Sequence, residues 1–86
     1  MKKIYLVQYQ ITENVATFEN RMKLLGSWIK YFNNSWLVES ELTAEKIYEK
    51  LSVDFKEASI IIIEIKKDNY FGRMNTSVWD YLKLRK

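Results

Sequence analysis

The sequence predicts an α+β domain: a four-stranded antiparallel sheet with two helices on one face, followed by a C-terminal helix. Three observations lead to this fold class. Four short segments are rich in β-branched and aromatic residues, two others repeat apolar residues at helical spacing, and Asn or Gly lies at two of the boundaries. These segments follow the order strand, helix, strand, strand, helix, strand.

Residues 3–11 are predicted to form the first strand. Side chains alternate between the two faces of a strand, and here both faces begin with apolar residues. This pattern is typical of a central strand that is covered on both sides. One face carries Tyr5, Val7, Tyr9 and Ile11, and the other carries Ile4, Leu6, Gln8 and Gln10.

The first helix is predicted to begin after Thr12, in a stretch with short polar residues that can cap it. Val15, Phe18 and Met22 then recur at the spacing of one helical face. Gly26 is expected to end the helix, because glycine readily adopts the left-handed conformation found after many helical C-termini.

A hairpin and a second helix follow. Residues 27–32 and 35–40 are short aromatic and β-branched runs, and the intervening Asn33-Asn34 favours a tight turn with positive φ. Thr43 is expected to cap the second helix. The apolar face of that helix is predicted to consist of Ala44, Ile47, Tyr48 and Leu51.

Residues 58–66 contain the most strongly predicted strand. Four consecutive isoleucines begin at Ile60, a fifth follows at Ile65, and β-branched residues favour extended backbone. By alternation Ile60 and Ile62 share one face, and the other isoleucines share the opposite face. Both faces therefore need cover, whereas one layer of helices can cover only one. A second copy of the chain is expected to cover the other.

This order of elements predicts the ferredoxin-like βαββαβ arrangement, with strands one and three at the centre of the sheet. Right-handed crossovers place both helices on one face. The 86 residues are expected to form one domain, with its core at residues 3–66. In the tail, residues 67–86, a turn precedes a terminal helix that Thr76 or Ser77 is expected to cap. Its buried side is predicted to consist of Val78, Trp79 and Leu82.

The composition excludes several classes of site. The chain has no cysteine and no histidine, which rules out thiol nucleophiles, disulfides, Cys/His zinc sites and imidazole bases. With only two glycines there is no glycine-rich phosphate loop, and no cofactor is expected. The sequence shows neither a signal peptide nor an apolar run of transmembrane length, which predicts a cytoplasmic protein without a membrane partner.

The charges are distributed unevenly along the chain. Residues 1–34 carry five basic and two acidic side chains, residues 35–64 carry three and seven, and residues 65–86 carry six and two. If the two basic ends meet in space, they form a positive patch that can hold phosphates; otherwise the charges are an ordinary solvated surface. The residues expected to bind nucleic acid are Lys2, Lys3, Lys66, Lys67, Arg73, Lys83, Arg85 and Lys86.

Carboxylates are the remaining candidates for acid–base or metal chemistry. Glu39 and Asp68 are weak candidates, because no two carboxylates have the spacing of a known metal motif. Glu64, in the last strand, is expected to need a basic partner or a backbone donor. Neither a metal site nor a catalytic residue is therefore predicted.

Three segments of the predicted sheet carry a family resemblance. Residues 5–10 read Tyr-Leu-Val-Gln-Tyr-Gln, residues 34–39 read Asn-Ser-Trp-Leu-Val-Glu, and residues 60–65 form the isoleucine strand. In order and place they resemble strands of CRISPR-associated protein 2, the related VapD toxins and their short relatives. That group has a hydrophobic strand ending in Tyr-Asp at the first segment and a Ser-Val-Trp or Ser-Val-Phe strand at the second. The resemblance covers residues 3–66.

The resemblance implies a homodimer in which the open sheet faces pack together. In nuclease-active members an aspartate at the end of strand one binds the metal ion, and Gln10 occupies that position here. A neutral amide does not supply the charge that holds a divalent cation. The residues expected at the dimer interface are Ile4, Leu6, Gln8, Gln10, Ile60 and Ile62.

Three functions are compatible with these patterns. The first is a non-catalytic homodimer that binds DNA, RNA or a protein partner, in phage defence or a toxin-like system. The second is a metal-dependent endoribonuclease similar to VapD, in which an acid such as Glu39 or Asp68 acts near the dimer axis. The third is a protein-interaction or assembly module in which the basic residues have no role. The sequence favours the first.

Overall fold

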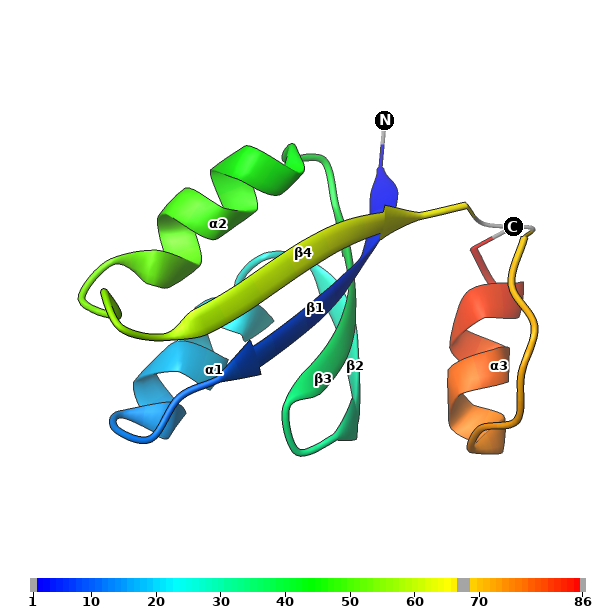
Figure 1. Ribbon diagram of the computed structural model, residues 1–86. Coiled ribbons are helices and arrows are strands. Elements are labelled where there is room, and N and C mark those ends of the chain that lie inside the picture. The colour runs from blue at the N-terminus through cyan, green and yellow to red at the C-terminus, as the bar shows by residue number, and fades with distance from the viewer. Residues whose placement is uncertain (1, 67–68, 86) are drawn as a thin grey trace.

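A computed structural model describes residues 2–66 and 69–85. Its four strands form one antiparallel sheet in the order β2-β3-β1-β4 (Figure 1). This confirms the predicted α+β class and is compatible with the ferredoxin-like arrangement. The elements are β1 (Lys3–Gln10), α1 (Val15–Lys23), β2 (Ser27–Phe32), β3 (Ser35–Ser40), α2 (Ala44–Ser52), β4 (Ser59–Ile65) and α3 (Thr76–Lys83).

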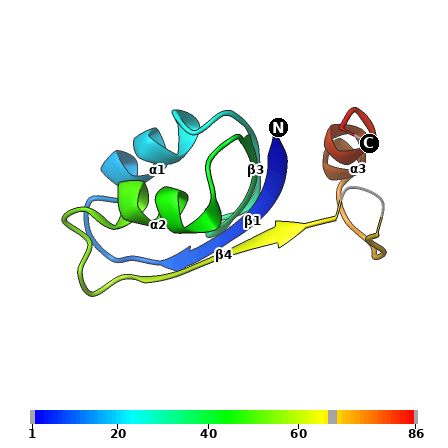
Figure 2. The ribbon, with the colours of Figure 1, turned by 90° about the horizontal axis from the view of Figure 1, so that it is seen from above.

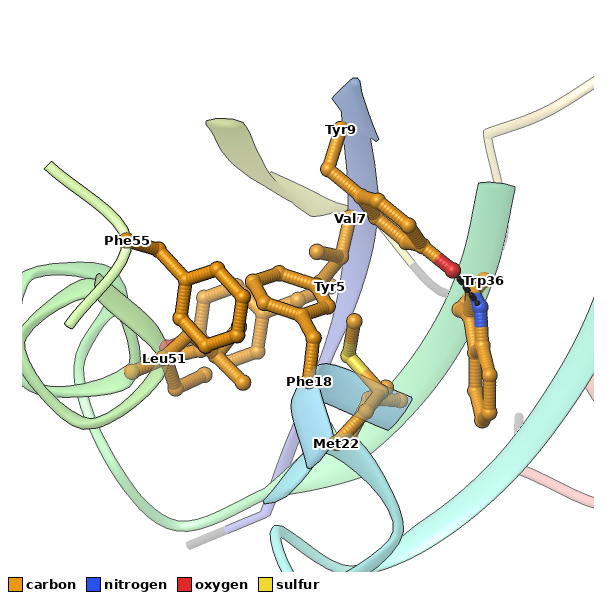
Figure 3. Packing of buried hydrophobic residues seen from close by; sticks show 10 residues of the cluster. Tyr5, Val7, Tyr9, Phe18, Met22, Trp36, Leu51 and Phe55 are labelled. Carbon is orange, nitrogen blue, oxygen red and sulfur yellow. Dashed lines mark hydrogen bonds between the residues drawn. The ribbon is translucent and has the colours of Figure 1, made fainter. Parts of the chain in front are cut away.

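Helices α1 and α2 lie together on one face of the sheet, as predicted (Figure 2). The core between these layers is rich in aromatic residues, and Figure 3 shows how its side chains pack together. The indole Nε1 of Trp36 donates a hydrogen bond to the hydroxyl of Tyr9 over 2.7 Å, so both polar groups are satisfied inside the core. The buried residues of this cluster are Tyr5, Val7, Tyr9, Phe18, Met22, Trp36, Val38, Ile47, Leu51 and Phe55.

The ends of the helices follow the predictions only in part. Thr43 caps α2 as expected, because its hydroxyl accepts a hydrogen bond from the amide of Lys46. Helix α1 begins after Asn14, whose side chain makes no capping bond, and α3 begins after Asn75 rather than after Thr76 or Ser77. Tyr48 was predicted on the buried face of α2, yet it is half exposed.

Two turn predictions are wrong in their mechanism. Helix α1 ends at Lys23, and Gly26 lies three residues later at the entry to β2, with a φ of 155°. It is needed there because the backbone passes close to the carbonyl of Glu39 on β3. The hairpin turn at Asn33 and Asn34 does form, but neither residue has positive φ. The pairing of β2 with β3 has a register shift close to this turn, between Lys30 and Phe32.

Helix α3 and the segment before it pack against part of the opposite face of the sheet, over Ile4 and Leu37. The hydroxyl of Tyr81 donates to the carbonyl oxygen of Ser27 at the start of β2 (2.8 Å). Ile4 is fully buried beneath this layer. The argument that a second copy is needed to cover Ile4 is therefore wrong, because the tail of the same chain covers it. The buried members of this second cluster are Ile4, Leu37, Val78, Tyr81 and Leu82.

The isoleucines of β4 lie on the faces opposite to those expected. Ile60 and Ile62 pair with Tyr9 and Val7 and pack into the core under α1 and α2. They cannot share an interface with Ile4, which faces α3. Alternation defines two faces of a strand, but only the register against its neighbour shows which face meets the helices.

The docking of α3 makes stability sensitive to alkaline pH. Burial raises the pKa of Tyr81 above its ordinary value of 10.0. Because the folded-state pKa is the higher one, this contribution to stability is complete below about pH 10 and is lost as the pH rises through the folded-state pKa. We expect the free energy of unfolding, measured with urea between pH 8 and pH 11, to fall more steeply with pH for the wild type than for Tyr81→Phe. Parallel losses would contradict the assignment.

Among the described residues, none of the helices is long and apolar enough to cross a membrane.

Candidate nucleic-acid interface

The two basic ends of the chain meet at one end of the sheet. Strand β1 begins where the antiparallel β4 ends. Ile4 pairs with Ile65, so Lys3 and Lys66 lie next to each other at the same end of the sheet. The end of α3 lies near this point in both ribbon views (Figures 1 and 2). We call this surface the basic end and define it by Lys2, Lys3, Lys66, Lys83 and Arg85.

Two cations of the basic end are engaged by acids. Lys3 Nζ lies 3.8 Å from a carboxylate oxygen of Glu64, although the Glu64 side chain is half exposed and does not depend on a partner as a buried acid would. Arg85 Nε lies 3.7 Å from Glu39 Oε1, and both of these side chains are 15% exposed. The Arg85 guanidinium also lies over the Tyr81 ring, 3.7 Å from its centroid. Arg85 therefore fastens the end of α3 to β3 and is poorly placed to contact a phosphate.

Three lysines remain available for a ligand. Lys2, Lys66 and Lys83 are exposed, and the described part of the chain offers them no ion pair. Glu41 follows β3 at the same end of the sheet and reduces the local net charge. The patch is therefore positive but modest. Of the other predicted contacts, Arg73 is exposed on the segment between β4 and α3, whereas Lys67 and Lys86 lie outside the described residues.

An aromatic group on the segment before α3 was not singled out from the sequence. The ring of Tyr70 stacks on Trp79 of α3, with centroids 5.8 Å apart and an interplanar angle of 14°. Phe71, between Tyr70 and Gly72, is fully exposed. Bare aromatic rings near basic side chains are the usual platforms for unpaired bases. The signal for this group was the adjacent Tyr-Phe pair in an otherwise polar stretch.

The acidic candidates do not assemble a metal site in the described residues. Glu39 is held by Arg85, and Asp68 falls outside the residues that the structure describes. Gln10 lies at the other end of β1, where it lines an open hollow of about 650 Å³. Asp54 lines the same hollow, and its carboxylate pairs with Arg21 at 3.6 Å. Within 2–66 and 69–85, no three His, Cys, Asp or Glu side chains gather in a group that could hold a metal ion.

Comparisons with protein-family models, with curated proteins and with solved structures gave no match. The resemblance to CRISPR-associated protein 2 and VapD therefore stays a prediction from the sequence.

Proposed function

We propose that the protein binds single-stranded nucleic acid at the basic end. The observation that carries this proposal is the β1–β4 register, which joins the two basic ends of the chain into one surface. Lys2, Lys66 and Lys83 supply the charges for phosphates, because no acid in the described residues neutralises them directly. The acidic middle third of the chain also places Glu39, Glu41 and Glu64 at this end of the sheet.

The exposed aromatic ring favours single strands over duplexes. Phe71 can stack on a base only where that base is unpaired, and Arg73 beside it can contact the adjoining phosphate. Stacking of this kind is worth about 1–3 kcal/mol per base and depends little on sequence. The proposal therefore describes a binding protein with little sequence preference, and it assigns no catalytic step.

The number of available cations predicts the salt dependence. Each phosphate contact on a single strand lowers the slope of log K against log salt concentration by about 0.7. Three lysines therefore give a slope of about −2. We expect fluorescence anisotropy with a labelled single-stranded 20-mer, in DNA and RNA forms, to show binding at 50 mM salt that weakens by about tenfold or more at 200 mM.

A charge-matched pair of variants locates the surface. Lys2→Glu combined with Lys66→Glu reverses two charges at the basic end, and we expect at least about tenfold weaker binding. Lys50→Glu combined with Lys56→Glu reverses two exposed lysines elsewhere on the molecule and should retain most of the affinity. Equal losses in the two double variants, or no binding at 50 mM salt, would overturn the proposal.

A further inference from the structure

Strand β4 is an unprotected edge of the sheet. It pairs with β1 on one side, and no described segment lies along its other side (Figure 2). Its seven residues pair with β1 without a bulge and include neither proline nor lysine. On the face away from α1 and α2, Ile61 is 51% exposed and Ile63 is 46% exposed. A regular, apolar edge strand presents unpaired N–H and C=O groups with which the strand of another chain can pair.

The other edge strand is protected by the usual means. Strand β2 has a register shift between Lys30 and Phe32, and a bulge there twists an edge away from regular pairing. Lys30 also places a charge on this strand, where it pairs with Glu19 at 2.6 Å. Strand β4 also carries one charge, Glu64, so the register shift is what distinguishes the two edges, and β4 is the one that can accept a partner.

The outward backbone groups of β4 can be assigned by alternation. The amide of Tyr9 donates towards the β3 side, to the carbonyl of Asn34 at 3.1 Å, so the even-numbered residues of β1 bond towards β4. Those residues pair with Ser59, Ile61, Ile63 and Ile65. The N–H and C=O groups of the intervening residues therefore point to the free edge, and these residues are Ile60, Ile62 and Glu64.

An exposed aromatic residue overhangs the same edge. Helix α2 packs over β4, with Ile47 and Leu51 directed to the core. Lys50 lies on the flank of α2 that borders α1, where it shares a hollow with Leu24 and Leu25. At 100° per residue Tyr48 falls on the opposite flank, above the outer side of β4, and it is 50% exposed.

We propose that β4 pairs antiparallel with β4 of a second copy of this chain and extends the sheet across a two-fold axis at Ile62. In this register Ile60 faces the partner's Glu64, and Ile61 faces the partner's Ile63. The three outward residues of each strand then exchange about six backbone hydrogen bonds. The two copies of Tyr48 approach each other across the axis.

Charge complementarity favours a second copy as the occupant. No pair in this register sets like charges opposite each other, and the one acid in the strand, Glu64, is already paired with Lys3. Antiparallel pairing also brings Glu57, before the strand, towards Lys66 of the other copy, after the strand. The paired residues 60–64 lie outside the basic end, but Lys66 belongs to both proposals, so the mass of the Lys2→Glu, Lys66→Glu variant is measured beside its affinity.

The oligomeric state tests the inference. Sedimentation equilibrium of the wild type should give the mass of two chains of 10.4 kDa each, and Ile61→Lys should give the mass of one. The lysine projects from the exposed side of β4, so the circular dichroism spectrum of the subunit should not change. The matched control is Phe32→Lys, which places the same charge at an exposed position of β2 and should stay dimeric.

Hydrogen exchange identifies the paired strand. In the wild type the amides of Ile60, Ile62 and Glu64 should exchange faster on dilution into the monomer range, whereas those of Ile61 and Ile63 should not, since they bond to β1. A wild type that stays monomeric at millimolar concentration would overturn the inference. A dimer that survives Ile61→Lys, or open-ended association instead of dimers, would overturn it as well.

Discussion

Gly26→Ala is expected to lower the free energy of unfolding by about 3 kcal/mol or more. A Cβ atom at this position would lie 1.9 Å from the carbonyl oxygen of Glu39, and that oxygen belongs to the backbone of the neighbouring strand. The φ of 155° adds strain for any residue with a side chain. Relief would require β2 and β3 to separate where Ser27 pairs with Glu39. Urea unfolding followed by tryptophan fluorescence measures the loss.

Gly72→Ala is the matched control for that substitution. Its added Cβ would lie 4.0 Å from the Trp79 ring, an ordinary van der Waals distance, and Gly72 is exposed. We expect a change within about 0.5 kcal/mol, since alanine also restricts the unfolded chain slightly. A tolerated Gly26→Ala, or similar losses in both variants, would show that β2 and β3 do not approach as closely as described.

The sheet and the helices over it were predictable because their signals are local. The periodicity of α2, its cap at Thr43, and the alternation in β1 each involve residues a few positions apart. Local patterns failed where a residue acts through a distant one. Gly26 is the residue type that often ends a helix, yet glycine is required here by the close approach of Glu39, thirteen positions later on another strand.

The candidate site was predicted as a positive patch on the condition that the two basic ends of the chain meet. Clustered basic residues at the two ends of the chain were visible in the sequence, and the β1–β4 register brings several of them together. The sequence could not show that Glu39 would engage Arg85, because that pair joins β3 to the end of α3. The sequence left the docking position of α3 open for the same reason, since an amphipathic helix does not specify the surface on which it docks.

Leu82→Ala is expected to destabilise the protein by about 2–3 kcal/mol, because it removes a buried side chain from the contact between α3 and the sheet. Leu82 is 3% exposed and packs in the cluster that contains Ile4 and Leu37, whereas Leu84, two residues later, is 83% exposed. Leu84→Ala should change the free energy of unfolding by less than about 0.5 kcal/mol. Urea unfolding measures the free energy of unfolding of both variants, which remove the same side chain from a buried and from an exposed position at the end of α3. Equal effects would mean that α3 is not docked on the sheet, and Ile4 would then again require a second copy to cover it.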